Sequence, residues 1–272
     1  NGHKLWPGPA GYADRFKTQH LTGHLGYWTV ATTDPKLGPD GVGLFYVPPD
    51  APGLEFSNPY QKMGFSHTEL NADLWYNNVR IPKRYRVDTE RGQGANLVSG
   101  FIIALGRLAG AARLTGLSEA VLEIVLEFTR NRIIEGTPMR ERSLFGKPLA
   151  KSQGVQWKLA DMYKDIEAGR GLLYRACQTA NPFPDPFLSA AAKIFCNEMS
   201  VSVTSEAVQL HGGYGFTDEY LVSRLYRGAR YGSLGGGASE TLRDLVGRRI
   251  IDEWDRAEGI LGLAGDAGAS HS

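Results

Sequence analysis

The stretch that decides the fold runs from Glu206 to Phe216 and reads EAVQLHGGYGF. Its apolar residues recur at helical spacing until a glycine cluster interrupts them. A dinucleotide-binding loop needs such glycines between a strand and a helix, whereas these glycines follow a helix. The Rossmann interpretation therefore fails. Without further context, the cluster indicates only a turn.

The helical spacing of apolar residues extends over most of the chain after Gln93. Helices are predicted over residues 95–130, 149–179, 187–210 and 240–254. Breaks fall at Gly136-Thr137-Pro138 and between Asn181 and Pro186, because proline does not continue a helix. Ser239 precedes the last helix and is its predicted N-cap. Long helices joined by such breaks predict an antiparallel bundle.

The first part of the chain has the pattern of strands rather than helices. Apolar runs at 27–32, 42–47 and 74–76 lie between turn signals such as Asp34-Pro35 and Pro48-Pro49. Strands followed by helices predict an α+β fold, with a small antiparallel β-sandwich or barrel domain before an antiparallel four-helix bundle. The predicted domains are 1–92 (β-rich, with an incomplete beginning), 93–263 (the bundle) and a disordered tail at 264–272.

Composition excludes several classes of function. The chain has 30 basic and 29 acidic residues, a balance that does not favour binding to nucleic acid or to an anionic membrane surface. The most apolar stretch, 97–117, contains Arg107 and Arg113, which indicates a buried helix rather than a membrane span. The histidines show no metal-ligand pairing. Cys177 and Cys196 match no zinc or redox spacing, so we expect buried free thiols in a reducing, cytoplasmic setting.

Together with its surroundings, the glycine stretch resembles the signature of the acyl-CoA dehydrogenase family. Arg142–Pro148 (RSLFGKP) precedes it and Arg224–Arg227 (RLYR) follows it, in the family's order. The strand region agrees through the segments NGHKLW (1–6), PGL (52–54), KMG (62–64) and NNVRIP (77–82). Each match is weak alone, but their ordered combination is strong. The resemblance implies the family's middle β-domain and C-terminal helical domain, without its first helical domain.

The resemblance implies an FAD-dependent oxidation of an acyl-CoA thioester, in which an α-proton is abstracted and the β-hydrogen leaves as hydride. The resemblance implies that Arg142 is the family's clamp on the flavin pyrophosphate. An arginine suits this role, because its planar guanidinium pairs phosphate oxygens bidentately. Phe145 matches the residue at the adenosine end. Gln209, Gly212 and Gly213 match the segment that approaches the adenine nucleotide closely, which glycine permits. In the family, this clamp acts on a flavin held mainly by the neighbouring subunit.

Both positions at which the family carries its catalytic base are glycines in this chain. Gly236 takes the place of the glutamate in the turn before the last helix. Gly106, immediately before Arg107, takes the place of the base that some members carry on the long central helix. A general base must be a titratable group, and glycine has none. The sequence therefore predicts no catalytic residue of its own.

The other departures from the family concern the flavin ring and CoA. Trp6 is an expected flavin contact, but Gly8 replaces the following threonine that hydrogen-bonds the flavin. Ala238 replaces a second threonine at the flavin, and Ala104 replaces an acidic residue that helps to hold CoA. Arg132 is an alternative to Arg142 for the clamp, because the stretch between them looks inserted. The losses fall on the chemistry, whereas the nucleotide clamp is retained.

Several functions remain open. The chain is a subunit or fragment of an active FAD-dependent acyl-CoA dehydrogenase, or a catalytically silent subunit that clamps FAD, or a family member whose chemistry needs no base. The alternative from another class is a helical-bundle structural protein without a cofactor. Expected partners are an acyl-CoA and an electron-transfer flavoprotein or similar acceptor. Apolar residues on more than one helix face also predict a homo- or hetero-oligomer, a dimer of dimers.

Overall fold

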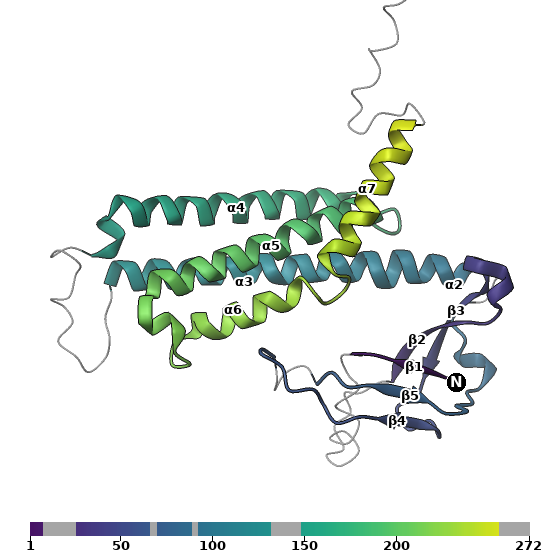
Figure 1. The fold of residues 1–272 in the computed structure, drawn as a ribbon. Helices are drawn as coiled ribbons and strands as arrows, with labels where there is room; N and C mark the ends of the chain where they lie inside the picture. Colours follow the sequence, from purple (N-terminus) through teal and green to yellow (C-terminus); the bar gives the residue numbers. More distant parts are fainter. Residues whose placement is uncertain (8–25, 66–69, 89–91, 132–147, 256–272) are drawn as a thin grey trace, which may run out of the picture. The chain divides into compact units, whose positions relative to one another are not determined.

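The computed structural model describes residues 1–7, 26–65, 70–88, 92–131 and 148–255 (Figure 1). The chain divides by its internal contacts into two compact units, Asn1–Ile102 and Ile103–Ser272. The first unit contains the described strands, and the second contains the long helices. Strands thus precede helices along the chain, as the predicted α+β fold requires.

Two small antiparallel sheets form the first unit. One has the strand order β1-β5-β4, and the other consists of β2 and β3. The bounds are Gly2–Lys4 for β1, Tyr27–Thr32 for β2, Val42–Val47 for β3, Leu54–Phe56 for β4 and Leu74–Tyr76 for β5, with 3-10 turns at Pro35–Gly41 (η2) and Lys83–Tyr85 (η3). β2, β3 and β5 confirm the predicted strands residue for residue, because apolar runs and flanking turn signals both mark them.

The apolar core of this unit contains side chains from both sheets. Tyr27 pairs with Val47 across β2 and β3, and both belong to the same buried cluster as Leu74 and Tyr76 of β5. The hydroxyl groups of Thr29 and Tyr76 share a buried hydrogen bond of 2.8 Å. A buried hydroxyl needs such a partner. Thr29 lies in β2 and Tyr76 in β5, so this bond joins the two sheets of the sandwich.

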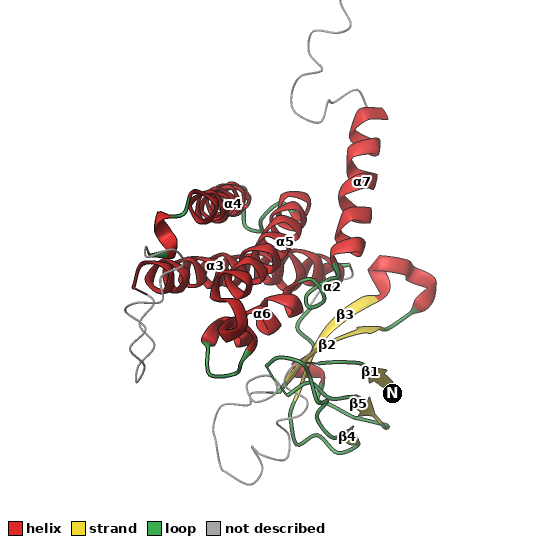
Figure 2. Ribbon diagram, turned by 60° about the vertical axis from the view of Figure 1, so that its left-hand side comes forward, coloured by secondary structure: helices red, strands yellow, loops and turns green. Residues whose placement is uncertain are grey.

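The second unit is an antiparallel bundle of α3, α4, α5 and α6, and α7 leaves it at an angle (Figure 1 and Figure 2). The bounds are Leu105–Asn131 for α3, Gln153–Gln178 for α4, Pro186–His211 for α5, Leu221–Gly232 for α6 and Ser239–Asp255 for α7. The shorter elements are α2 at Gln93–Asn96, the π-helical η4 at Leu97–Ala104, η7 at Leu149–Lys151 and η8 at Gly212–Phe216. The predicted four-helix bundle is confirmed.

α5 is the central helix, since it packs against α3, α4, α6 and α7. Its first residue follows Asp185, whose carboxylate accepts a 2.7 Å hydrogen bond from the Leu188 amide. Pro186 occupies the first helical position, where its missing N–H costs nothing. Buried side chains along α5 include Ala192, Cys196, Val203 and Ala207. The break predicted before residue 187 therefore contains the N-cap of the central helix, Asp185.

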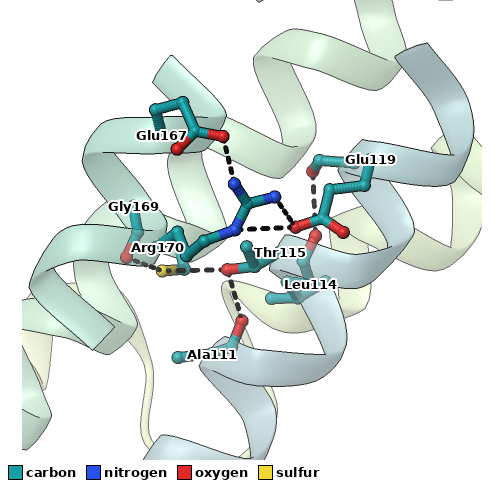
Figure 3. Close-up of polar contacts among 9 residues, drawn as sticks. Ala111, Leu114, Thr115, Glu119, Glu167, Gly169 and Arg170 are labelled. Atoms are coloured by element: carbon teal, nitrogen blue, oxygen red, sulfur yellow. Dashed lines mark hydrogen bonds and ion pairs between the residues drawn. The ribbon is translucent and has the colours of Figure 1, made fainter. Parts of the chain in front are cut away.

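A polar contact joins α4 to α3 beside this core (Figure 3). The Arg170 guanidinium pairs with Glu119 of α3, with Nε 3.1 Å from Oε1, and with Glu167 of its own helix. The Thr115 hydroxyl donates to the carbonyl four residues earlier at 3.0 Å and reaches the Cys196 sulfur at 3.5 Å. The Arg170 ion pairs are partly exposed, and solvent screens such pairs, so that they contribute little to stability. The apolar core is therefore the main source of the bundle's stability.

One helix was missed, and two local predictions are wrong. α6 was not predicted as a helix, although Val222 and Ala229 bury one of its faces. Ser239 does not cap α7, because its amide donates to the Ser233 carbonyl at 3.2 Å and its buried hydroxyl has no partner within the described chain. Cys177 is exposed, so of the two cysteines only Cys196 is the buried free thiol that was predicted.

The helical stretch from Gln93 to Arg130 is long and apolar enough to cross a membrane by length and composition alone. Leu108 and Leu114 are buried as predicted, but Phe101 and Ile103 keep much of their surface exposed. The helix that was predicted to be buried is therefore only partly buried in the single chain. α3 packs against α5 as the helices of a bundle do. A core helix of a bundle can also be long and apolar enough to cross a membrane.

His211 closes the core at the end of α5. The residue is 3% exposed, and its ring stacks on Phe128 with centroids 4.0 Å apart. Its Nδ1 atom lies 2.8 Å from the Ala207 carbonyl oxygen, which suits a neutral ring that donates from this atom. Burial lowers the pKa of His211 below its ordinary value of 6.5. The folded chain therefore holds this ring neutral.

We expect the free energy of unfolding to fall as the pH drops below about 6.5, because the unfolded chain binds the His211 proton more readily than the folded chain. The measurement is the denaturant midpoint between pH 5 and pH 7, for the natural chain and for His211→Phe, which keeps an aromatic ring but cannot titrate. The natural chain should lose more stability than the variant. The exposed His3 gives the control, His3→Phe, and equal losses in all three proteins would contradict a neutral buried His211.

Candidate functional site

The turn after α5 needs glycine at two positions for its own shape. A Cβ atom on Gly215 would lie 2.4 Å from the Val208 carbonyl oxygen and 2.9 Å from the His211 Cβ, so a side chain there would clash. Gly212 has a φ of 63° and a ψ of −142°, a conformation that is essentially restricted to glycine. These two glycines therefore form the turn itself.

Gly213 differs from its neighbours, because neither its backbone nor the surrounding chain requires glycine. It is exposed, it is not among the glycines with positive φ, and a Cβ atom on it would meet no atom within 4 Å. The exposed Gln209 lies one helical turn before it. The missing Cβ leaves the Gly213 backbone open to close approach by an atom from outside the chain.

A cavity of about 480 Å³ opens beside this turn. It is lined by Ser205, Val208, Gln209, Gly215, Phe216, Ser223, Tyr226 and Arg227. The Phe216 residue is 88% exposed. An exposed aromatic ring at the edge of a cavity with several polar groups is typical of a surface that contacts a ligand or a partner.

Arg227 of α6 supplies the cationic group of this cavity. Its guanidinium donates to the Ser223 hydroxyl at 2.8 Å and to the Asp218 carboxylate at 2.8 Å. The Asp218 side chain is mostly exposed, so this ion pair is screened by solvent. Sequence analysis quoted Arg227 within a motif but missed these contacts. The four-residue spacing of Ser223 and Arg227 on one helix was the available signal.

The structure brings three of the predicted cofactor-binding residues together. Gln209, Gly212 and Gly213 lie at the end of α5 and in the turn that follows it. Arg142 and Phe145 lie outside the described residues, so their role in the clamp stays a prediction. The described turn is therefore one part of the predicted nucleotide clamp.

Trp6, the predicted flavin contact in the first unit, has an unusual backbone conformation. Its φ is 60°, which is rare for a bulky residue. Its ring stacks on Tyr60 with centroids 4.7 Å apart, and its carbonyl accepts a 3.1 Å hydrogen bond from Asn71. Backbone strain that is maintained by packing is enriched at functional sites. Its contact with a flavin stays a prediction, and Gly8 lies outside the described residues.

The two predicted base positions differ in their backbone. Gly236 has a φ of 69° and Gly237 a φ of 102°, so a side chain at Gly236 would be strained. Gly106 lies within α3, and a Cβ atom there would meet no atom within 4 Å. Sequence analysis missed Lys193, which is buried beside the Gly236 turn. A single lysine within the apolar run of α5 was the available signal.

Comparison with known proteins assigns the fold to a family. The model of the acyl-CoA dehydrogenase C-terminal domain matches residues 92–251. The short-chain-specific acyl-CoA dehydrogenase of Megasphaera elsdenii is 32% identical over 226 residues, which is 83% of this chain and 56% of that protein. The chain thus spans somewhat more than half the length of the relatives that it matches.

Solved structures agree with this assignment. The butyryl-CoA dehydrogenase of Megasphaera elsdenii has a TM-score of 0.77 at 30% identity, over 92% of this chain and 60% of that chain. A chain solved in work on the electron transferring flavoprotein of Acidaminococcus fermentans has a TM-score of 0.77 at 28% identity, over 92% of this chain and 60% of that chain. With the family model covering more than half of its residues, the chain belongs to the acyl-CoA dehydrogenase family.

Proposed function

We propose that this chain is a flavin-clamping subunit or fragment of an FAD-dependent acyl-CoA dehydrogenase. The assembly would oxidise an acyl-CoA thioester to the α,β-enoyl-CoA. The observation that carries the proposal is the contrast between two turns of one unit. The turn after α5 exposes an open glycine backbone beside a cavity, whereas the turn before α7 has Gly236 where the family carries its base.

The described residues fit the nucleotide end of FAD. The exposed Gly213 gives a backbone that a phosphate or ribose can approach closely, and Gln209 offers both a donor and an acceptor beside it. Arg227, which is paired with Asp218, brings a guanidinium group to the same cavity. Arg142 and Phe145 would complete the clamp at the pyrophosphate and the adenosine. Bound FAD would supply the hydride acceptor of the reaction.

The catalytic base is the part of the site that this chain does not provide. The turn lacks a carboxylate at Gly236. Its backbone also favours glycine there, because the φ of Gly236 is positive. This observation favours the second candidate function, a catalytically silent subunit whose partner chain carries the glutamate. In either case, this chain binds and orients the nucleotide, and the α-proton leaves to a group elsewhere in the assembly.

We propose that the assembly is an oligomer, a dimer of dimers. Phe101, Ile103 and Leu105 are large apolar residues that stay exposed on the helical stretch leading into α3. An apolar surface of this kind is typical of a subunit contact. The electron acceptor would be an electron-transfer flavoprotein or a similar protein. The relatives support an acyl-CoA substrate at the level of the family.

Gly213→Ala should lower the flavin content of the purified assembly without lowering its melting temperature. The added methyl group meets nothing in the chain, but it would displace the nucleotide from the backbone. Loss of one hydrogen bond to a charged group costs about 1.5–3 kcal/mol, or about tenfold or more in affinity. The measurement is the ratio of flavin absorbance to protein, together with thermal unfolding.

Gly154→Ala is the matched control, because Gly154 is also exposed in a helix and a Cβ there would also meet no atom within 4 Å. It should keep the natural flavin content. Equal flavin content in Gly213→Ala and Gly154→Ala would show that the open backbone of Gly213 does not contact the cofactor.

Gly236→Glu alone should not create acyl-CoA oxidation. The left-handed backbone costs about 1–2 kcal/mol for a residue with a side chain, and Gly8 and Ala238 replace residues expected to contact the flavin. Gly106→Glu is the companion variant, since its helical backbone accepts glutamate without strain. The measurement is oxidation of butyryl-CoA with an artificial electron acceptor. A positioned base is worth about 100- to 10,000-fold in rate, so a gain of that size in either variant would contradict the proposal.

A further inference from the structure

Lys193 is a buried cation on the central helix α5. The residue is 2% exposed, and it is one of the buried residues of α5. A buried charge is costly unless other groups compensate it. Lys193 therefore needs partners, and the structure supplies them from one short segment of chain.

Three backbone carbonyl groups surround the Lys193 ammonium. Its Nζ atom donates to the carbonyl oxygens of Gly232 at 3.1 Å, Gly235 at 2.7 Å and Gly237 at 3.0 Å. Gly232 is the last residue of α6, where helix carbonyls lack partners and carry partial negative charge. Gly235 and Gly237 belong to the turn between α6 and α7. One side chain thus fixes both ends of this turn.

The three bonds require the protonated form of the side chain. An ammonium group has three N–H donors, whereas a neutral amine has two, so loss of the proton removes at least one bond. The stem of Lys193 also fits its site closely. A Cβ atom on Gly110 of α3 would lie 3.7 Å from the Lys193 Cε atom, and one on Gly236 would lie 3.4 Å from it.

The charged groups that act on Lys193 are cations. Burial, together with Arg107 and Arg113 of α3, lowers the pKa of Lys193 to about 8. No carboxylate forms an ion pair with Lys193 in the part of the chain that the structure describes. The ring of Tyr231 on α6 lies beside Gly235 and so covers the same turn. The bonds to the carbonyl groups and the repulsion from the arginines therefore oppose each other near physiological pH.

We propose that Lys193 is a positioning residue, whose charged ammonium fixes the turn Gly232–Gly237 and so sets where Gly236 and the start of α7 lie. Lys193 acts through the backbone of this turn and does not itself contact a ligand. The importance of Gly236 as the base position rests on the proposed function. The hydrogen bonds from Lys193 to the turn do not rest on the proposed function, since they lie within one chain and need no cofactor.

The test is the pH dependence of the glycine amide signals from the turn, recorded by NMR on the full chain with ¹⁵N-labelled glycine and no added flavin. The signals of Gly235, Gly236 and Gly237 should shift together with a midpoint near pH 8. In Lys193→Met this transition should be absent. In Lys193→Arg the turn keeps a cation that does not titrate, so the signals should stay near their low-pH positions throughout.

Lys151→Met is the control, because Lys151 is an exposed lysine in η7, and its variant should keep the natural transition. Should Lys193→Met not fold, labelling the lysine side chains of the natural protein reports the titration of Lys193 directly. A common midpoint for Lys193 and the glycine signals supports the proposal. Glycine signals that do not move between pH 7 and pH 9, or that move equally in a folded Lys193→Met, would overturn it, whatever the flavin content.

Discussion

The burial of α5 at the centre of the helical unit is the constraint on which the site depends. Four helices pack against it, so its position and rotation are fixed by the core. The glycine turn after α5 begins where that helix ends at His211, and the stacking of the His211 ring on Phe128 holds the turn against α3. Lys193, in the first third of the same helix, donates hydrogen bonds to the second turn. Both turns therefore take their places from one helix.

In the proposed function, the two turns separate cofactor binding from proton transfer. A nucleotide clamp needs an open backbone and a few hydrogen-bond donors. Gly213 and Gln209 are exposed and would supply them. A base needs a titratable side chain in a suitable backbone conformation, and Gly236 offers neither. The positive φ at Gly236 would oppose a glutamate side chain there, so the proposed division has a backbone cause as well as a compositional one.

Sequence patterns predicted most of the fold and only part of the site. Strands between proline turns and helices with regular apolar spacing were found because these signals are local, as for β2 and α5. The short α6 was missed although its apolar residues keep helical spacing, because it has only 12 residues. The hydrogen bonds of Lys193 could not be predicted, since their acceptors are backbone carbonyl groups about forty residues away that carry no sequence signal. The glycines of the first turn could be found, but only the structure distinguishes Gly213 from Gly215.

The central claim is that this chain holds the flavin nucleotide and relies on another chain for the base. Native mass spectrometry of the assembly purified from its own cell, combined with flavin quantification, tests this claim most directly. The account predicts a second, unlike chain in the assembly and one flavin for each pair of unlike chains. A homo-oligomer of this chain alone, with one flavin per copy and robust oxidation of acyl-CoA, would contradict it.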